Sequence, residues 1–280
     1  MEITNLVTSP FGIGTRLIFE LLKRGESVYT VFASPKDVPM SFLGRANLKY
    51  GFTKLDQELN IEKGLPHRAV HLFHIYEFYN APSLKLFHAN TMSTLLLLEW
   101  AKKVKVSKFI YLSSGEVYGQ GRNLTESAPF NPKSFYATTK LQAEMLIRYY
   151  SKNFELKIVR LFFPFGKGLN YGYLHHLFEN IKSGQGIETD YCTISPTYID
   201  DIIEPLLNLR DRPGYIVSNF CGTPVDIKEL VEKIEKILGN KAKITGIGKT
   251  ELSGSGSNAR ETLNYKETPL DLALKNALAQ

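Results

Sequence analysis

The alternation of strand and helix patterns is the feature that most limits what this chain can fold into. Up to about residue 160 of 280, short apolar runs rich in β-branched and aromatic residues alternate with helical patterns. Strands are expected at 3–8, 27–32, 48–52, 69–74, 108–113 and 157–162, and helices at 15–23, 84–104 and 136–150. Phe109-Ile110-Tyr111-Leu112 is wholly apolar, as a strand buried on both faces must be. This order predicts an α/β fold, a doubly wound parallel sheet with helices on both faces.

The character of the sequence changes after Phe163. Glycine and proline become frequent, beginning with Pro164-Phe165-Gly166-Lys167-Gly168, and the strict alternation ends. Helical patterns return at 174–182, 199–209 and 227–238, an apolar stretch covers 214–221, and the small polar segment 252–258 is expected to be a mobile loop. We therefore expect a first domain at 1–163 and a smaller mixed α/β lobe at 164–280, partly interleaved with the first.

Composition and charge exclude several classes of function. The net charge of +6 either favours anionic ligands such as nucleotides or reflects a lysine-rich surface. No basic run is interleaved with aromatics, so nucleic acid is not a favoured partner. The apolar run 95–98 ends at Glu99 and no secretory leader is visible, so neither a membrane span nor export is expected. Cys192 and Cys221 fit no disulfide framework, and the histidine spacing fits no metal site. We expect a cytoplasmic protein without a metal.

Two polar motifs that could support acid–base chemistry come after the fifth predicted strand, about twenty residues apart. The strand leads into Ser113-Ser114-Gly115-Glu116-Val117-Tyr118-Gly119, and a later helix opens with Tyr136-Ala137-Thr138-Thr139-Lys140. Residues four apart share one helix face, so the Lys140 ammonium can lower the cost of ionising the Tyr136 phenol. Such a tyrosine can exchange a proton with a carbinol oxygen, which a serine at the strand end can hold. A Tyr-x-x-x-Lys pair alone is more often a solvated helix face, but the serine motif upstream favours the catalytic interpretation.

These motifs resemble the extended short-chain dehydrogenase/reductase family, in the branch of NAD-dependent epimerases and dehydratases that mostly act on nucleotide sugars. The segment 90–99 resembles the asparagine-bearing fourth helix of the family, 113–119 its serine strand, and 136–140 its catalytic helix. Tyr198-Ile199-Asp200-Asp201 resembles a motif in the second lobe of the family, and 259–265 resembles its C-terminal pattern more weakly. The resemblance implies a Rossmann-type NAD(P)-binding domain followed by a substrate-binding lobe.

The resemblance also implies roles for individual residues. Tyr136 would be the general acid/base, and Lys140 would tune it while holding the nicotinamide ribose. Ser114 would hold the substrate oxygen, with Ser113 beside it in the cofactor site. Asn90 would support Lys140 through water, although an asparagine inside a helix can equally bond to the backbone.

Three positions depart from the family pattern. Family dehydratases place an aspartic acid beside a glutamate, and here Gly115 takes the place of the acid. Glu116 could still act as a base, but an elimination would lack its proton donor, so a dehydratase is not expected. The family often has an asparagine that contacts the sugar nucleotide where this chain has Phe163. Substrate contacts are therefore not expected to copy those of the best-known members.

The first strand ends in a shortened glycine loop, Thr8-Ser9-Pro10-Phe11-Gly12-Ile13-Gly14. The family loop reads Thr-Gly-x-x-Gly-x-x-Gly, so the first glycine is missing and the loop is one residue short. Gly12 and Gly14 permit close backbone approach at a helix N-terminus, whereas Pro10 removes one donor. We expect a modified phosphate loop in which Thr8, Gly12, Ile13 and Gly14 contact the cofactor. A loop that no longer binds phosphate is the alternative.

The end of the second strand bears on the choice between NAD and NADP. NAD-specific relatives place an aspartate near Phe32 to bind the ribose 2′-hydroxyl, and none is found there. Ser34 and Lys36 could instead meet a 2′-phosphate, so NADP(H) is mildly favoured. The alternative is an ordinary polar turn.

Three functions are consistent with the sequence. The first is an NAD(P)-dependent oxidoreductase that reduces a keto group on a nucleotide-linked sugar with Ser114, Tyr136 and Lys140. The second is a nucleotide-sugar epimerase that holds NAD tightly. The third is a non-catalytic nucleotide-binding protein, against which the complete catalytic set counts. A homodimer through helices 84–104 and 136–150 is expected by analogy only.

Overall fold

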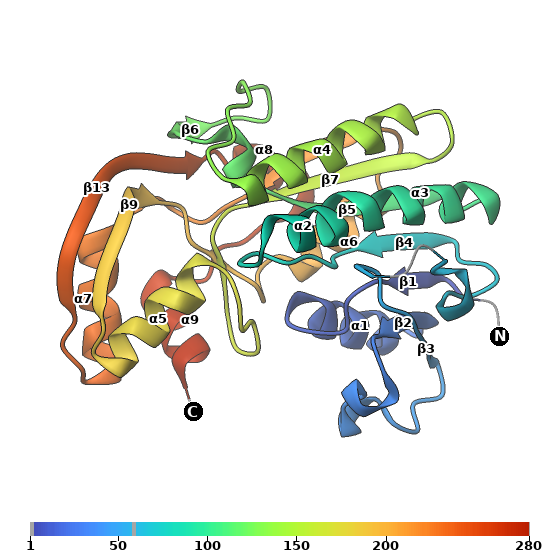
Figure 1. Ribbon diagram of the computed structural model, residues 1–280, viewed down its shortest axis with the longest axis horizontal. Coiled ribbons are helices and arrows are strands. Elements are labelled where there is room, and N and C mark those ends of the chain that lie inside the picture. The colour runs from blue at the N-terminus through green and yellow to red at the C-terminus, as the bar shows by residue number, and fades with distance from the viewer. Residues whose placement is uncertain (1–2, 58–59, 280) are drawn as a thin grey trace. The chain divides into compact units, whose positions relative to one another are not determined.

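A computed structural model describes residues 3–57 and 60–279 (Figure 1). A seven-stranded sheet has the order β11-β7-β5-β4-β1-β2-β3. Its strands are β1 (Asn5–Val7), β2 (Val28–Phe32), β3 (Leu48–Phe52), β4 (His71–His74), β5 (Lys108–Ser114), β7 (Glu155–Leu161) and β11 (Ile216–Phe220). The pairs from β3 through β2, β1 and β4 to β5 are all parallel. The predicted α/β fold with a parallel sheet is confirmed.

The chain reverses its direction across this sheet between β1 and β4. It moves from β1 outward to β2 and β3, and then returns to the other side of β1 as β4. Leu6 therefore pairs with Tyr29 on one side and with Leu72 on the other. Because parallel crossovers are right-handed, the helices before and after the reversal cover opposite faces of the sheet. In such sheets a ligand binds at the carboxyl ends of the strands beside the reversal.

The helix after β4 is continuous but not regular. The sequence predicted one helix over 84–104, and the structure has α2 (Ser83–Leu86), a π-helical segment η4 (Phe87–Met92) and α3 (Ser93–Lys103). The hydroxyls of Ser93 and Thr94 donate to the carbonyls of Ala89 and Asn90, at 2.5 and 2.7 Å. These side chains compete with backbone donors for the carbonyls, which favours the wider π turn.

Other helices complete the connections of the large sheet. Helix α1 (Ile13–Lys23) joins β1 to β2, and α4 (Phe135–Tyr149) lies beside α3 in Figure 1. Short 3₁₀ helices are η1 (Pro35–Asp37), η2 (Met40–Phe42), η3 (Glu62–Gly64) and η5 (Gly115–Tyr118).

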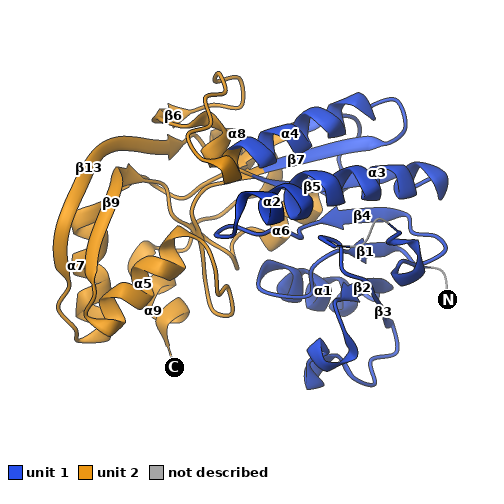
Figure 2. Cartoon of the chain, in the orientation of Figure 1, with its two compact units in different colours: residues 1–113, 138–159, 209–216 blue, residues 114–137, 160–208, 217–280 orange. Residues whose placement is uncertain are grey.

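The chain forms two compact units whose segments alternate along the sequence (Figure 2). Unit 1 contains residues 1–113, 138–159 and 209–216, and unit 2 contains 114–137, 160–208 and 217–280. Leu6, Leu72 and Phe109, on the central strands, are fully buried in the core of unit 1. The domain boundary expected between residues 163 and 164 stays a prediction.

Unit 2 contains a four-stranded sheet in the order β12-β9-β13-β6 and the two-stranded pair β10-β8. Its strands are β6 (Gly121–Leu124), β8 (Pro164–Phe165), β9 (Gly186–Ile194), β10 (Thr197–Tyr198), β12 (Val225–Asp226) and β13 (Lys243–Gly254). The helices after Pro164 are α5 (Tyr173–Ser183), α6 (Ile203–Asp211), α7 (Ile227–Leu238), α8 (Ser257–Leu263) and α9 (Leu270–Leu278). Asp226 caps α7 by accepting a hydrogen bond from the Lys228 N–H at 2.8 Å, and Gly239 ends it in a left-handed conformation.

The segment 252–258, which the sequence predicted to be a mobile loop, is instead the end of β13 and the start of α8. Ser253 is fully buried. A Cβ atom on Gly254 would lie 2.7 Å from the Phe162 ring and 3.0 Å from the Cys221 sulfur. The small residues therefore serve close packing, and the prediction of a mobile loop is wrong.

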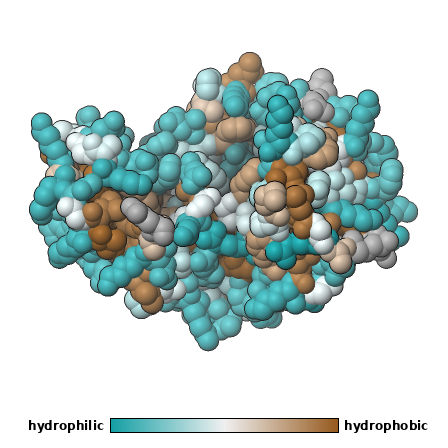
Figure 3. Space-filling view, turned by 90° about the horizontal axis from the view of Figure 1, so that it is seen from below, coloured by the Kyte–Doolittle hydropathy of each residue, from teal (hydrophilic) through white to brown (hydrophobic). Residues whose placement is uncertain are grey.

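Hydrophilic residues cover much of the face shown in Figure 3, with separate hydrophobic patches between them. Within residues 3–57 and 60–279, no helix has the length and apolar character needed to cross a membrane. The cytoplasmic location stays a prediction.

The close packing at Gly254 gives a test of the fold. Gly254→Ala should lower the free energy of unfolding by about 1–3 kcal/mol, because the added methyl group has no room against Phe162. Gly246→Ala on the same strand is the matched control, since its Cβ would lie 3.6 Å from Glu188, an ordinary contact. Urea unfolding of both variants measures the difference. Equal losses in the two variants would show that the contact with Phe162 does not decide the effect.

Candidate active site

The loop between β1 and α1 is built around two glycines. Gly12 has φ 53°, a conformation that favours glycine, and α1 begins at the next residue, Ile13. Gly14 lies in the first turn, where a Cβ atom would come within 1.7 Å of the Ser9 carbonyl oxygen. Gly14 therefore allows the loop to fold back onto its own helix. The cap residue Gly12 has no side chain to cover the helix N-terminus, whose partial positive charge suits a phosphate.

A cavity of about 100 Å³ lies beside this loop, at the carboxyl ends of β1, β2 and β3. Thr8 and Phe11 line it from the loop, and Phe32 lines it from the end of β2. The half-exposed Phe11 ring packs edge-on against Phe32, with 6.0 Å between ring centroids. The two rings give the cavity an apolar wall.

Asp37 lies at this cavity, where the sequence led us to expect Ser34 and Lys36. Its carboxylate accepts hydrogen bonds from the backbone N–H and the hydroxyl of Ser34, at 2.9 and 3.0 Å. Among the described residues that line the cavity, Asp37 and Asp56 are acidic and Lys54 is basic. Sequence reasoning missed Asp37 because it looked for an acid at the strand end. The available indication was the capping box that Ser34 and Asp37 form around η1.

His74 lies at the end of β4, and its ring forms hydrogen bonds both to the glycine loop and to the helix after β4. The Thr94 hydroxyl donates to the Asn90 carbonyl at 2.7 Å, so it accepts a hydrogen bond from His74 Nε2 at 2.8 Å. His74 Nδ1 is then free to accept from the Thr8 hydroxyl at 3.2 Å. This order of donors selects the neutral imidazole with its proton on Nε2. Burial, assisted by the positive charge of Lys140, lowers the pKa of His74 to about 3.

Thr8 in turn fixes the segment that follows β4. Its hydroxyl oxygen accepts the backbone N–H bonds of Ile75 and Tyr76, both at 3.0 Å. The Tyr76 hydroxyl donates to Asp56 at 2.8 Å. Thr8, which the sequence predicted to touch the cofactor, therefore also orders the neighbouring connection.

Lys140 lies on α4 with 1% of its surface exposed. Its Nζ donates to Glu77 Oε2 at 2.8 Å and to the Leu112 carbonyl at 2.6 Å, and it lies 4.6 Å from the centre of the Tyr111 ring. Burial alone would lower the pKa of Lys140, but Glu77 and then Tyr111 oppose this, and the pKa is raised above its ordinary value of 10.5. The side chain is therefore an ammonium ion at neutral pH.

Asn90 lies in the π segment, and both its side-chain oxygen and its side-chain nitrogen form hydrogen bonds. Asn90 Oδ1 accepts the Phe78 N–H, and Nδ2 donates to the Phe78 carbonyl and to the Thr139 hydroxyl, all at 3.0 Å. The Asn90 side chain thus fixes both the backbone N–H and the backbone carbonyl of Phe78, in the connection after β4.

The two serines at the end of β5 have different partners. Ser113 donates to the buried Glu144 carboxylate at 2.6 Å, within unit 1. Ser114 caps η5 in unit 2, where its hydroxyl oxygen accepts the Glu116 N–H at 3.1 Å. Because this bond uses an oxygen lone pair, the Ser114 hydroxyl keeps its hydrogen to donate elsewhere.

Phe162 occupies the space that a side chain at residue 115 would need. A Cβ atom on Gly115 would lie 2.5 Å from the Phe162 ring. An aspartic acid at this position would therefore require the ring to move. The neighbouring Glu116 faces Ser134, whose hydroxyl lies 3.5 Å from Oε2.

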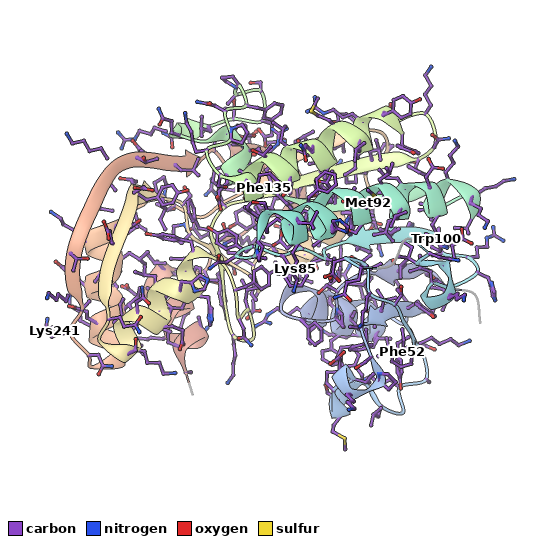
Figure 4. The ribbon with its side chains drawn as sticks, in the orientation of Figure 1. Phe52, Lys85, Met92, Trp100, Phe135 and Lys241 are labelled. Atoms are coloured by element: carbon purple, nitrogen blue, oxygen red, sulfur yellow. The ribbon has the colours of Figure 1, made fainter. Side chains whose placement is uncertain are left out.

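Tyr136 is 7% exposed in the first turn of α4, next to Phe135, which Figure 4 labels. Ser134 caps this turn, where its hydroxyl oxygen accepts the Ala137 N–H at 3.0 Å. Tyr136 and Lys140 are four residues apart on one helix, so they lie on the same helix face. Ser114 and Tyr136 belong to unit 2 and Lys140 to unit 1, and β5 and α4 carry the chain between the units.

Phe163 stands in a cluster of three aromatic rings in unit 2. Its φ of 39° is rare for a bulky residue. Phe163 packs edge-to-face on Tyr173 and Tyr191, with centroids 5.5 and 5.1 Å apart, and the two tyrosine rings are 5.3 Å apart. Burial, and then the negative charge of Glu116, raises the pKa of Tyr191.

The fold of the glycine loop leads to a prediction. Gly14→Ala should abolish dinucleotide binding, because the methyl group would force the Ser9 carbonyl and the loop away from the helix. Gly246→Ala is the control, since a Cβ there would lie 3.6 Å from Glu188, an ordinary contact, and Gly246 is not among the glycines with a positive φ. Binding is measured by fluorescence titration with NAD(H) and NADP(H). Normal binding by Gly14→Ala would show that this loop does not hold the ligand.

The sequence matches known proteins along much of its length. Residues 12–205 match the model of the NAD dependent epimerase/dehydratase family. UDP-glucuronate 4-epimerase from Thermodesulfobacterium geofontis is 31% identical over 170 residues, which cover 55% of this chain and 51% of that protein. dTDP-D-glucose 4,6-dehydratase from Dictyostelium discoideum is 34% identical over 177 residues, which cover 53% of this chain and 38% of that protein. The chain thus spans about half the length of such relatives, or less.

A solved structure shares the whole fold. UDP-glucuronic acid 4-epimerase from Bacillus cereus, in complex with UDP-glucuronic acid and NAD, superposes with a TM-score of 0.81 at 24% identity, over 98% of both chains. At this identity the likeness shows the fold alone. The family match is independent of it and spans more than half of the chain. The chain therefore belongs to the NAD dependent epimerase/dehydratase family.

Proposed function

We propose that this chain is an NAD(P)-dependent enzyme that acts on a nucleotide-linked sugar by hydride transfer. The observation that carries the proposal is the buried, charged Lys140 one helical turn beyond Tyr136, with Ser114 at the end of β5. The UDP-sugar in the Bacillus cereus structure and the names of the relatives support the substrate class.

The loop and cavity of unit 1 fit a dinucleotide. Gly12, Ile13 and Gly14 at the start of α1 would hold its pyrophosphate, and the cavity beside Thr8 would take the adenosine ribose. The cavity is smaller than a typical pocket for a whole ligand, so it suits one part of an extended molecule. Bound NAD(P) would supply the hydride acceptor and donor.

The chain's own residues would manage the proton. Lys140 stays charged and favours ionisation of the Tyr136 phenol, whose ordinary pKa is about 10. Tyr136 would take the proton from the carbinol oxygen on oxidation and return it on reduction. Ser114, with its hydroxyl hydrogen available, would donate a hydrogen bond to the same oxygen.

The outcome of hydride transfer distinguishes two candidate functions. The sequence favours net reduction of a keto group. The relative named a UDP-glucuronate 4-epimerase favours epimerisation, in which hydride is removed and returned within one site. Dehydration is disfavoured, because Phe162 fills the space beside Gly115 where an acid would stand. A homodimer through helices 84–104 and 136–150 remains part of the proposal by analogy.

The aromatic cluster bears on how the sugar is held. Phe163, Tyr173 and Tyr191 offer ring faces and edges where the family often offers an amide. Glu116 and Asp190 are acidic groups close enough to raise the pKa of Tyr191. We propose that this cluster contacts the sugar ring through apolar surface and selects it by shape.

Asp37 leads to a prediction about the cofactor. The preference for NADP(H) expected from Ser34 and Lys36 stays a prediction, and Asp37 argues against it, because its carboxylate would repel a 2′-phosphate. We expect tighter binding of NAD(H) than of NADP(H), and a shift toward NADP(H) in Asp37→Asn. Titration of both cofactors by fluorescence measures the ratio, with Glu232→Gln as a control for the loss of an exposed charge. Tighter NADP(H) binding by the natural chain would restore the original preference.

Tyr136 gives the test of the chemistry. Tyr136→Phe removes the proton-carrying oxygen and should lower kcat by about 10²–10⁴-fold while cofactor binding persists. UDP-, dTDP- and GDP-linked sugars and 4-keto sugars would be screened as substrates. Loss of reduced-nicotinamide absorbance would identify reduction, and conversion without net cofactor change would identify epimerisation.

The control for this experiment is Tyr149→Phe, which removes the same atom from an exposed tyrosine of the same helix. It should retain normal turnover. A Tyr136→Phe variant that also turned over at the normal rate would contradict the assigned mechanism.

A further inference from the structure

The connection between β4 and α2 carries a carboxylate that the mechanism above does not use. Glu77 is 13% exposed at its side chain and pairs with Lys140, which is 1% exposed, at 2.8 Å. The ammonium has three hydrogens, and its other neighbours are the Leu112 carbonyl and the Tyr111 ring. Among residues 3–57 and 60–279, Glu77 is therefore the carboxylate that forms an ion pair with this buried cation.

The backbone on both sides of Glu77 is fixed by side chains from other elements. Before it, the Thr8 hydroxyl accepts the N–H groups of Ile75 and Tyr76. After it, the Asn90 side chain bonds to both the N–H and the carbonyl of Phe78. Hydrogen bonds therefore restrain the backbone immediately before and immediately after Glu77.

The Phe78 side chain adds a further restraint. The Lys85 ammonium lies 4.2 Å from the centre of its ring, and Figure 4 labels Lys85 near the start of the helix after β4. Phe78 is thus held at its backbone by Asn90 and at its ring by Lys85. This arrangement leaves the neighbouring Glu77 carboxylate directed at Lys140.

We propose that Glu77 is a positioning residue that keeps Lys140 charged and in place, and that Asn90 contributes by fixing the backbone beside Glu77. The consequence for catalysis rests on the proposed function, since it is the charge of Lys140 that would tune Tyr136. The ion pair itself does not depend on that function. It can be tested on the protein without any ligand.

Ionisable groups from three other elements lie around the pair. From β4, burial keeps His74 neutral with a pKa of about 3. From β5, burial raises the pKa of Tyr111 to about 12, although Lys140 acts against this. From α4, Glu144 accepts a hydrogen bond from Ser113. Glu77 is the largest of the influences that oppose burial at Lys140, ahead of Tyr111, so removing its charge should leave burial to dominate.

The pH dependence follows from this change. In the natural chain the pKa of Lys140 is raised above 10.5, so its contribution to stability is complete below that pH and is lost only above it. In Glu77→Gln, burial should lower the pKa of Lys140 below its unfolded value. The unfolded chain then binds more protons than the folded one, so the stability of the variant should rise with pH up to about 10.4.

The experiment measures urea midpoints of the unliganded full chain from pH 7 to 10. Glu77→Gln should have a lower midpoint than the natural chain at pH 7, and the deficit should shrink as the pH rises. Glu77→Asp, which keeps the charge, should retain the natural pH profile. Glu62→Gln is the matched control, because Glu62 pairs with Lys103 at 2.6 Å on the exposed surface of the same unit. A deficit in Glu77→Gln that is constant with pH would overturn the proposal.

A double variant covers the case in which Glu77→Gln does not fold. Glu77→Gln with Lys140→Met removes both charges, and it should be more stable than Glu77→Gln alone, because the damage comes from an uncompensated buried cation. A double variant no more stable than the single one would overturn the proposal, since packing rather than charge would then explain the loss. Neither measurement involves NAD or a sugar, so failure here is distinct from failure of the proposed function.

Discussion

The buried ammonium of Lys140 is the constraint on which the proposed site depends. Removing a charge of this kind from water costs several kcal/mol unless nearby groups compensate. Compensation comes from a carbonyl and a ring of β5 and from a carboxylate on the connection after β4. These elements are adjacent because β4 and β5 pair in the sheet. The pairing of β4 with β5 therefore brings together the groups that compensate the charge of Lys140.

A second constraint acts at the reversal between β1 and β4. His74 is placed there with two hydroxyl partners, of which one donates and one accepts. A protonated ring would need two acceptors, but the Thr8 oxygen already accepts two backbone N–H bonds. The neutral imidazole is thus the form that the surrounding donors allow. Through Thr8 it connects the glycine loop to the same connection that carries Glu77.

The sequence predicted the frame of this site and missed much of its interior. Strand positions followed from apolar runs, because strands buried on both faces must be apolar whatever surrounds them. The sequence could not assign Asp37 and Glu77 to the site. Asp37 belongs to it because it lines a cavity formed by several strands, and Glu77 because it pairs with Lys140, which is distant in the chain. The segment 252–258 was mistaken for a loop, because small residues suit both a mobile turn and close packing against a ring such as Phe162.

The π segment after β4 shows the same limit of sequence reasoning. Its apolar spacing indicates a helix, but Ser93 and Thr94 divert two carbonyls from the regular ladder. Asn90 lies inside this segment, where its side chain reaches Phe78 and Thr139 together. The helical pattern predicted a helix over 84–104, but it could not predict the hydrogen-bond partners of Asn90, because these lie in other elements.

The two units differ in how they depart from the family pattern. In unit 1 the glycine loop is shorter, yet the groups that fix its shape are present, since Gly14 packs on its own loop and Thr8 is fully bonded. In unit 2 Gly115 and Phe163 replace polar residues, and aromatic rings fill the space beside them. Rings of this size leave no room for an added acid without repacking. An acid at residue 115 would therefore require changes at Phe162 as well as at Gly115, whereas the proposed hydride transfer places no side chain at that position.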